Sequence, residues 1–538
     1  MSPNYPTPEH EANQLEPIEE ALHWLMSTTL HLALGLLLGW GVARLMRSHQ
    51  LNWTWAGVGL LVWVIARPLF GGLGLTLGVA ALAASWHGRR WTREDIQAGG
   101  DLAQIVRSFQ GPLDAARATW AKGALRRMLS SGASWFEGDE VLIGQDVQDG
   151  GLVRIPLGGA TGGTHTLVLG AAGSGKTVTM TGVAVHAVEH GMGAVLLDPK
   201  GDPSMLNEAR GVAEREGRPF VHWTPEGSVV YNPYAHGSDT EIADKLLAGE
   251  HYTEPHYLRQ AQRYLGHEVR ALRQAGIVVS LANVVRYLDP SELDRVVGSL
   301  PKQRVEKVTA YLRSLTRAQQ SGLSGVRDRL AVLAESDVGQ WLDPETPGVA
   351  SFDLLEMIEQ RAVVYFSLES DRRPLLAQML GAAIVQDLQS ATARLQGRRI
   401  PTVVVIDEFA ALAARQVAGL FARARGAGIS LMLGTQELAD LRVPGLEQLH
   451  DQVMGNLTSL IAHRQVVPDS ATLIADIAGT QGAWSTTMHS DGKSTRSRGR
   501  EYTVHPDEIK SLPRGHAIVI VPTGKRPVRI TRIFSLDR

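Results

Sequence analysis

The sequence predicts an α/β fold in which a doubly wound sheet domain is interrupted by an all-α domain and preceded by a transmembrane segment. Three observations carry this prediction. From residue 165 onward, short Val, Ile and Leu runs alternate with helical stretches, a pattern typical of a parallel sheet covered by helices. Residues 238–345 mostly lose such runs and contain fewer Gly, which favours helices. Residues 24–43 carry no Asp, Glu, Lys or Arg, as expected of a membrane-spanning helix.

The overall composition excludes several classes of protein. The chain has 538 residues and no Cys, which excludes a disulfide framework, thiolate metal sites and Cys nucleophiles. Hydrophobic residues make up 44% and charged residues 20%, so the chain is not disordered. Its 53 Lys and Arg nearly balance 55 Asp and Glu, which excludes a histone-like blanket of positive charge. At about 150 residues per domain, the length predicts two to four domains.

The N-terminal apolar region is long enough to cross a bilayer more than once. Trp24–Ala43 is closed by Arg44 and Arg47, and twenty helical residues reach about 30 Å, the thickness of the hydrocarbon core. A second apolar stretch, Leu51–Ser85, is interrupted only by Arg67-Pro68. Trp residues stand near its ends, where the headgroup regions favour them.

The number of crossings stays open between two and three. One long second span gives two crossings and places Arg44 and Arg47 outside. A division into Leu51–Ala66 and Pro68–Trp86 gives three crossings, with the acidic residues 1–22 outside and the Arg clusters inside. We favour three, because the positive-inside rule prefers this arrangement.

A phosphate-binding loop follows a predicted hairpin (141–144 with 152–155). His165–Leu169 is an apolar run that fits a buried strand, and the letters G-A-A-G-S-G-K-T come directly after it, followed by an amphipathic stretch. Glycines let backbone N–H groups wrap phosphates, the lysine reaches the β- and γ-phosphates, and the threonine ligates Mg²⁺. The sequence therefore predicts an ATP and Mg²⁺ site made of Gly170, Gly173, Ser174, Gly175, Lys176 and Thr177.

The partner carboxylates of this loop stand after another apolar run. Thr402–Ile406 is an unbroken Val/Ile-rich stretch that ends in Asp407-Glu408. A central strand here would bring Asp407 beside Thr177 and the Mg²⁺, with Glu408 free to act as the base that polarises the attacking water. A structural alternative is that the two acids cap the following helix.

Two further residues are candidates for catalysis. Ile429–Gly434 is another buried strand, and Gln436, two residues beyond it, is placed to sense the γ-phosphate. Arg423 and Arg425 precede this strand near a helix end, and one of them is a candidate arginine finger toward a neighbouring subunit. The alternative for either arginine is a solvated helix face.

Two basic segments are candidates for DNA contact. Residues 251–330 hold 13 Lys and Arg against 7 Asp and Glu, and four arginines there share a helix face: Arg259, Arg263, Arg270 and Arg273. Residues 484–500 are rich in Ser, Thr, Gly and Arg, which predicts a mobile loop. Its basic residues are Lys493, Arg496, Arg498 and Arg500. A solvated face and an exposed loop remain equally acceptable interpretations.

Several motifs together resemble a known family. The P-loop, D-E-F and G-T-Q occur in the order seen in the RecA-like motor ATPases. With L-V-L-G-A-A-G-S-G-K-T (167–177), L-L-D-P-K-G-D (196–202), V-I-D-E-F-A-A-L (405–412), the membrane segment and the helical insertion, the chain more specifically resembles the type IV coupling proteins of bacterial conjugation, the TraD/TraG group. The resemblance covers most of the chain.

The resemblance implies a function. Such a protein is a homo-hexameric ATPase in the bacterial inner membrane, multi-pass, with its ATPase domain in the cytoplasm. It passes single-stranded DNA with its relaxase complex to the components of a type IV secretion channel. Under this hypothesis Arg425 is supplied in trans. The competing hypotheses are a double-stranded DNA translocase of the chromosome-segregation type, an ATPase exporting protein substrates only, and a membrane scaffold with a vestigial nucleotide site.

The domain boundaries follow from these segments. We expect an acidic tail (1–22), a transmembrane segment of two or three helices (23–87), a linker (88–140), a first part of the nucleotide-binding domain (141–237), an all-α domain (238–348) and a second part of the nucleotide-binding domain (349–538) with the basic loop 484–500. The remaining strands are expected at 194–197, 219–223, 362–368, 457–463, 517–521 and 528–533.

Overall fold

The computed structural model divides into two compact units, which we describe separately. The described residues are 8–48, 53–70, 73–97, 134–159, 162–248, 255–442, 446, 448–488, 494–524 and 526–536. The first unit comprises residues 1–130 with the short segments 148–151 and 484–498, and the second contains the remainder.

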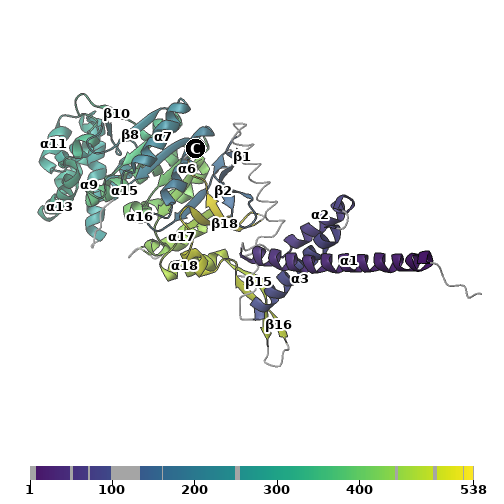
Figure 1. The fold of residues 1–538 in the computed structure, drawn as a ribbon. Coiled ribbons are helices and arrows are strands. Elements are labelled where there is room, and N and C mark those ends of the chain that lie inside the picture. Colours follow the sequence, from purple (N-terminus) through teal and green to yellow (C-terminus); the bar gives the residue numbers. More distant parts are fainter. Residues whose placement is uncertain are drawn as a thin grey trace, which may run out of the picture. The chain divides into compact units, whose positions relative to one another are not determined.

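A large mixed sheet forms the centre of the second unit (Figure 1). Within the described residues it has twelve strands in the order β1-β2-β18-β17-β14-β6-β13-β12-β7-β11-β8, and β3 pairs with β2. The run from β14 to β8 is parallel, whereas β17, β18 and β2 pair antiparallel. The strands are β1 (Phe136–Glu137), β2 (Glu140–Asp146), β3 (Leu152–Pro156), β6 (His165–Leu169), β7 (Gly193–Asp198), β8 (Phe220–Trp223), β11 (Val363–Ser367), β12 (Thr402–Ile406), β13 (Ile429–Thr435), β14 (Ser459–His463), β17 (His516–Ile520) and β18 (Val528–Ile533).

The parallel strands are buried on both faces, because helices cover each side of the sheet. Strands β6, β7, β11, β12, β13 and β14 consist of consecutively buried residues, as the unbroken apolar runs predict. The helices of this layer are α6 (Lys176–Glu189), α7 (Pro203–Arg215), α14 (Leu354–Glu359), α15 (Pro374–Arg394), α16 (Phe409–Ala427), α17 (Leu449–Asn456), α18 (Pro468–Ala478) and α19 (Pro506–Lys510), with the 3-10 turn η2 (Leu438–Leu441). The predicted doubly wound α/β class is confirmed.

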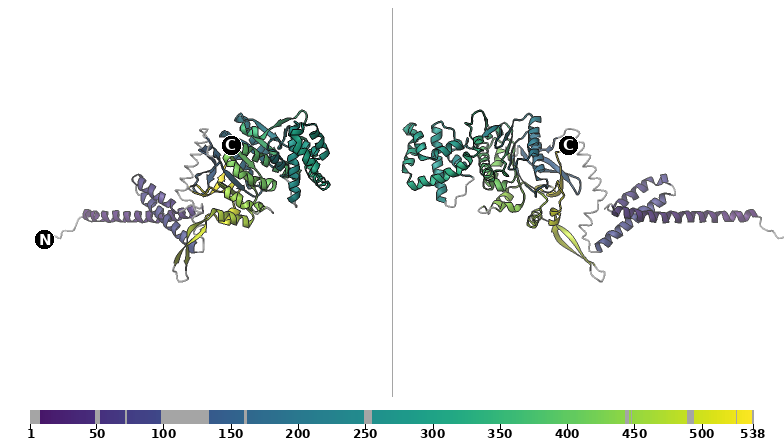
Figure 2. Two further views of the ribbon diagram at one scale, coloured as in Figure 1. Left: turned by 180° about the vertical axis from the view of Figure 1, so that it is seen from behind. Right: turned by 60° about the vertical axis from the view of Figure 1, so that its left-hand side comes forward.

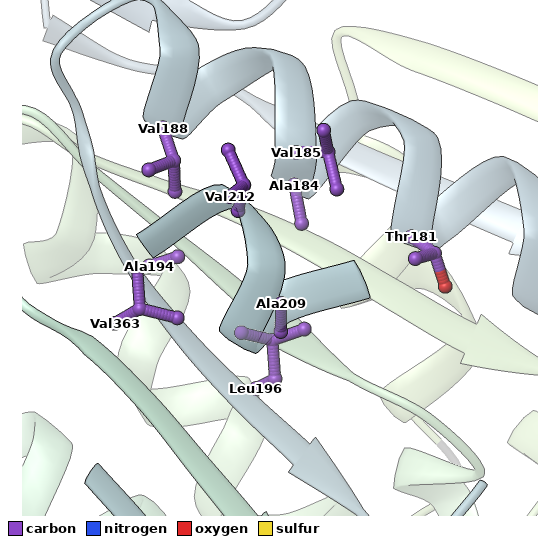
Figure 3. A pocket seen from close by; sticks show the side chains of 9 residues that line it. All are labelled: Thr181, Ala184, Val185, Val188, Ala194, Leu196, Ala209, Val212 and Val363. Atoms are coloured by element: carbon purple, nitrogen blue, oxygen red, sulfur yellow. The ribbon is translucent and has the colours of Figure 1, made fainter. Parts of the chain in front are cut away.

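The packing between α6, α7 and the sheet leaves one very small apolar cavity (Figure 3). Its volume is about 10 Å³, and aliphatic side chains of α6, α7, β7 and β11 line it. Thr181 stands at its rim, and its hydroxyl donates a 2.8 Å hydrogen bond to the carbonyl of Thr177. The helix that begins at the P-loop lysine is therefore packed closely onto the sheet.

An all-helical block interrupts the sheet domain between β9 (Val229–Tyr231) and β10 (Ala350–Phe352), which pair in parallel. Figures 1 and 2 show its helices gathered beyond the β8 end of the sheet. They are α8 (Asp239–Leu246), α9 (Pro255–Gln274), α10 (Leu281–Tyr287), α11 (Pro290–Gly298), α12 (Lys302–Ser314) and α13 (Arg317–Ala334), followed by the 3-10 turn η1 (Gly339–Leu342). The predicted helical insertion is confirmed.

A buried lysine connects this block to the sheet domain. Lys245 of α8 is 2% exposed and donates to the Asp387 carboxylate of α15 at 2.6 Å. Its ammonium also donates to the carbonyls of Pro233 and His236 at 3.0 and 2.6 Å. Tyr231 donates to the second oxygen of Asp387 at 2.7 Å. All three ammonium donors are satisfied, which a buried charge requires.

Most of the arginines predicted to share a helix face of α9 interact within the protein. Arg270 and Arg273 both pair with Asp239, at 2.9 and 3.0 Å, and Arg263 stacks over the Tyr311 ring. The positive charge that this face offers to a phosphate backbone is therefore smaller than the count of arginines suggests.

The first unit contains three helices among its described residues: α1 (Pro8–Ser48), α2 (Trp55–Phe70) and α3 (Leu73–Gln97). By length and composition, one helical segment there, Glu20–Arg47, is long and apolar enough to span a membrane, and Trp55–Ile65 is a shorter apolar segment. Many large apolar side chains of α1 are exposed, as a lipid-facing helix requires.

Helices α1 and α3 run parallel to each other, with α2 antiparallel to α3. Interatomic contacts show the direction: His31 bonds Thr76 at 2.9 Å, whereas Arg47 stacks over Trp91 further along both helices. Gly35 and Gly39 of α1 permit this approach, because a Cβ there would lie 2.7 Å from Val79 and 2.5 Å from Ala83. Between α2 and α3 the order reverses, since Trp53 meets Gly88 and Trp63 meets Gly78.

Two expectations about the chain's organisation were wrong. Helix α2 continues through Arg67-Pro68 to Phe70, and α3 begins at Leu73, so the interruption expected at Arg67-Pro68 is absent from the described residues. The segment 484–500 is largely strand: β15 (Thr480–Met488) and β16 (Ser494–Tyr502) form a two-stranded sheet. Its Thr, Trp and Tyr residues have high β-propensity, which outweighed the polar composition.

The remaining small elements complete the description. Strands β4 (Gly158–Gly159) and β5 (Gly162–Gly163) form a short ribbon that lies against α16 and β13. Helix α3 extends ten residues into the predicted linker 88–140, β1 and β2 begin within it, and residues 98–133 lie outside the described part of the chain. Lys493 of the basic segment also lies outside it.

Candidate functional site

The predicted site residues other than Arg425 lie at one edge of the parallel sheet. Strands β14, β6, β13, β12 and β7 are neighbours and point the same way, so the loops that follow them share an edge. Such an edge is where open α/β sheets bind ligands. The register aligns the ends of β6 and β13, with Leu169 opposite Thr435.

The P-loop has the backbone that its glycines make possible. Gly173 and Gly175 have φ angles of 72° and 113°, a region that disfavours other residues. A Cβ on Gly170 would lie 2.4 Å from the Ser174 hydroxyl oxygen. That hydroxyl is buried and has no hydrogen-bond partner among the described residues. Helix α6 begins at Lys176 with no side-chain cap, so its first N–H groups face the loop.

Lys176 lies between the two carboxylates that follow β12, Asp407 and Glu408. Its ammonium is 2.8 Å from Asp407 Oδ1 and 3.0 Å from Glu408 Oε1. The side chains are 9%, 13% and 16% exposed respectively, so the three charges interact in a partly desolvated setting. The predicted grouping of these residues is thus present in the fold.

Backbone geometry at the end of β12 constrains the two acids. Glu408 has a φ angle of 47°, which is uncommon for a residue with a side chain, and it immediately precedes α16. Asp407 Oδ1 accepts the Glu408 N–H at 2.9 Å. Gly434 on β13 is required beside them, because a Cβ there would lie 2.5 Å from Asp407 Oδ1. Both acids thus reach the ammonium of Lys176 from consecutive positions in the chain.

Gln436 contacts the same carboxylate oxygen as Lys176. Its side-chain amide donates to Glu408 Oε1 at 3.2 Å. The loop that carries it is held by Asp440, whose Oδ2 accepts from the Thr435 hydroxyl at 2.8 Å and from the Gln436 N–H at 3.2 Å. Gln465 donates to the Gln436 carbonyl at 3.2 Å. Gln436 and the P-loop lysine therefore share one oxygen of Glu408 as their partner.

Thr177 and Arg425 complete the predicted set: Thr177 lies at the P-loop, whereas Arg425 lies near the far end of α16. Thr177 is the second residue of α6, and its hydroxyl has no hydrogen-bond partner in the part of the chain described, so it is available as a ligand. Arg425 is exposed near the far end of α16, seventeen residues after Glu408. At 1.5 Å per residue this helix separates Arg425 from its own chain's Glu408 by about 25 Å. Arg425 does not join this site within one chain.

Two residues at the site had no role assigned from the sequence. Lys200, in the loop after β7, places its ammonium 3.7 Å from Glu408 Oε1. His463, at the end of β14, is fully buried; its Nε2 bonds the Thr179 hydroxyl at 2.9 Å and its Nδ1 the His516 carbonyl at 3.0 Å. Lys200 stands two residues after the end of β7 and His463 is the last residue of β14, and such a position at the end of a buried strand is the signal that the sequence offered.

Acid is expected to destabilise the fold around the site through two buried histidines. Burial lowers the pKa of His463 to about 4, and the positive charge of Lys176 acts in the same direction. Burial likewise lowers the pKa of His165 to about 4. Because both values lie below that of an unfolded histidine, the unfolded chain binds more protons as the pH falls. Stability is therefore lost between pH 6.5 and 4, by about 2 kcal/mol per histidine from pH 7 to 5.

Thermal melting of the purified chain at pH 7, 6 and 5 measures this effect. We expect the melting temperature to fall steadily over the series. A His463→Gln variant, which has no imidazole to protonate, should show a smaller fall. A melting temperature that is constant over this pH range would contradict the prediction.

The residues present fit a magnesium nucleotide. The glycine backbone, the unpaired Ser174 hydroxyl and the uncapped start of α6 offer donors suited to phosphate oxygens. Thr177 and Asp407 supply hard oxygen ligands suited to Mg²⁺. When bound, the ion would neutralise charge on the phosphates.

Comparison with protein families gives a match over most of the chain. Residues 151–532 match the model of the type IV secretion-system coupling protein DNA-binding domain. Among characterised proteins, the type 4 coupling protein DotL of Legionella pneumophila is 22% identical over 343 residues. That alignment covers 51% of this chain and 44% of DotL, so the chain spans less than half of that relative.

Solved structures give a consistent result for the fold. The unbound bacterial conjugative coupling protein TrwBdeltaN70 superposes with a TM-score of 0.54 at 17% identity, covering 71% of this chain and 87% of that one. TrwB in complex with ADP and Mg²⁺ gives 0.53 at 18% identity, covering 69% and 85%. At these identities the likeness concerns the fold.

Proposed function

The chain belongs to the type IV secretion-system coupling proteins, and on this premise we propose that it is a membrane-anchored ATPase that moves relaxase-bound single-stranded DNA into a type IV secretion channel. The observation that carries the proposal is the cluster of Lys176, Asp407, Glu408 and Gln436 at the edge of the parallel sheet. These residue types are the ones that nucleotide hydrolysis by a motor domain requires.

In this proposal each site residue has one role. The P-loop backbone, Ser174 and Lys176 bind the phosphates, and Thr177 with Asp407 holds Mg²⁺. Glu408 takes a proton from the attacking water, and Gln436 orients that water or senses the γ-phosphate. The structures of TrwB in complex with ADP and Mg²⁺ and with an ATP analogue support a magnesium nucleotide as the ligand.

The assembly we propose is a homo-hexameric ring. Arg425 lies too far from its own chain's Glu408 to act there, and its exposure leaves it available to a neighbouring subunit. An arginine supplied in trans would stabilise charge in the transition state and link hydrolysis in adjacent subunits. In such a ring the all-α block is the part we assign to receiving the relaxase complex.

Hydrolysis is expected to respond to single-stranded DNA. The purified full chain in detergent should hydrolyse ATP several-fold faster with single-stranded DNA than without it, and respond less to duplex DNA. The Glu408→Gln protein, prepared identically, controls for contaminating ATPases. A flat response to both DNAs would contradict the proposal and favour export of protein substrates only. The internal pairing of Arg270 and Arg273 with Asp239 is the observation that keeps this second candidate in view.

The membrane topology we propose has three crossings in the bacterial inner membrane. The parallel course of α1 and α3 requires the chain to return between them, and α2, at 16 residues or about 24 Å, supplies the return. This arrangement brings Arg44, Arg47, Arg89 and Arg90 to one end of the helices, which the positive-inside rule assigns to the cytoplasm. The N-terminus then lies outside and the ATPase domain inside.

The absence of Cys makes this topology directly testable. Single variants Ser2→Cys and Ser134→Cys, expressed in cells, can be treated with a membrane-impermeant maleimide before and after lysis. We expect labelling of Ser2→Cys in intact spheroplasts and of Ser134→Cys only after lysis. Protection of both positions before lysis would indicate an even number of crossings instead.

A further inference from the structure

The loop after β7 brings a second lysine to the catalytic carboxylate. Lys200 is 55% exposed, and its ammonium lies 3.7 Å from Glu408 Oε1. The same oxygen accepts from Lys176 at 3.0 Å and from Gln436 at 3.2 Å. Glu408 is therefore the common partner of three side chains, each from a different strand end.

The loop is built to hold Lys200 in this place. Asp198, 3% exposed, accepts the Lys200 N–H at 2.9 Å through Oδ1, and its Oδ2 accepts from the Tyr365 hydroxyl and the Asp202 N–H. Gly201 follows at φ 74°, and a Cβ there would lie 2.4 Å from the Ser367 hydroxyl oxygen. A buried carboxylate and a glycine in the left-handed region fix the backbone on both sides of the lysine.

The charge of Glu408 needs a cation other than Lys176 when a nucleotide is bound. Lys176 contacts both Asp407 and Glu408, but a P-loop lysine serves the phosphates of a bound nucleotide. Asp407 is the acid suited to a magnesium ligand, so its charge is then balanced by the ion. Glu408 has neither compensation, and the remaining cation within 4 Å of it among the described residues is Lys200.

We propose that Lys200 is a positioning residue for ATP hydrolysis: it holds the Glu408 carboxylate in place and balances its charge when Lys176 engages the phosphates. The inference rests on the proposed ATPase function and adds to it a residue that acts through Glu408. It also explains why Asp198 fixes the backbone of the D-P-K-G-D segment by hydrogen bonds although the Lys200 side chain is exposed.

Equilibrium binding tests this directly, without relying on turnover. Affinities for ADP and for a non-hydrolysable ATP analogue are measured on the full chain in detergent, for the unmodified protein, Lys200→Ala, Glu408→Gln and the double variant. An uncompensated Glu408 repels the γ-phosphate, so Lys200→Ala should bind the ATP analogue about 5-fold more weakly, the upper range for a half-exposed ion pair. ADP binding should be unchanged. In the Glu408→Gln background the loss should disappear, because the carboxylate charge is gone.

Turnover supplies the second measurement. Lys200→Ala should lower kcat more than it raises KM for ATP, and Lys200→Arg should restore most of the rate. Lys510→Ala, on α19, is the matched control, because it also removes a partly exposed lysine that pairs with a carboxylate, Asp507, at 2.7 Å; it should behave like the unmodified protein. An undiminished kcat in Lys200→Ala, or the same loss of affinity in the Glu408→Gln background, would overturn the proposal. Failure of the unmodified chain to bind nucleotide would instead overturn the proposed ATPase.

Discussion

Replacing Glu408 by Gln is expected to abolish ATP hydrolysis while leaving nucleotide binding in place. The substitution keeps the size of the side chain and its contacts with Lys176 and Gln436 but removes the basic carboxylate. Loss of a general base costs about 10²- to 10⁴-fold in rate. The measurement is phosphate release by the purified full chain under saturating ATP and Mg²⁺, with and without single-stranded DNA.

Two comparisons make the result specific to this carboxylate. Glu214→Gln, on the exposed face of α7, carries the same chemical change and should retain the rate of the unmodified protein. Affinity for a fluorescent ATP analogue should stay equal or increase in Glu408→Gln. DNA-stimulated hydrolysis that persists in this variant would remove Glu408 from the role of base.

Lys176→Ala is expected to have the second largest effect, and on binding as well as rate. The ammonium makes charge-assisted contacts with Asp407 and Glu408, and its loss leaves two neighbouring carboxylates at the place where phosphates bind. Loss of one charge-assisted contact to a ligand costs about 1.5–3 kcal/mol, or roughly 10- to 100-fold in affinity. Hydrolysis should fall by about 10²- to 10³-fold besides. Fluorescence titration with nucleotide and a steady-state assay measure the two effects.

A loss of folding in Lys176→Ala must be distinguished from a loss of nucleotide binding or hydrolysis. The melting temperature of Lys176→Ala is expected to fall, because Asp407 and Glu408 lose their buried cation, so binding and hydrolysis are measured well below it. Extraction from membranes should remain close to that of the unmodified protein. Lys510→Ala again serves as the control. An affinity for ATP equal to that of the unmodified chain would contradict a phosphate-binding role for Lys176.

The sequence predicts those elements of the fold that neighbouring residues alone specify. Fully buried strands require unbroken apolar runs, so β6, β12 and β13 can be found from their letters, and the polar residues after them fall at a common edge because parallel strands end together. The grouping of Lys176 with Asp407 follows from that rule alone.

The parts that sequence reasoning missed depend on distant pairing or on weak local preferences. The partner of Arg270 and Arg273 is Asp239, more than thirty residues away, and no periodicity within α9 reveals it. Strands β15 and β16 stabilise each other, so neither polar segment alone indicates a strand. The contact of Lys200 with Glu408 joins strand ends about two hundred residues apart, and only the sheet order brings them together.

The buried Lys245 limits how freely the helical block can be exchanged between related proteins. Its three donors are matched by two carbonyls before α8 and by a carboxylate on α15, which belongs to the sheet domain. A chimaera that imports the block alone would bring a lysine to a site lacking its acid, or leave Asp387 without its cation, at a cost of several kcal/mol. Grafts intended to change substrate preference should therefore carry Tyr231 and Asp387 with the block.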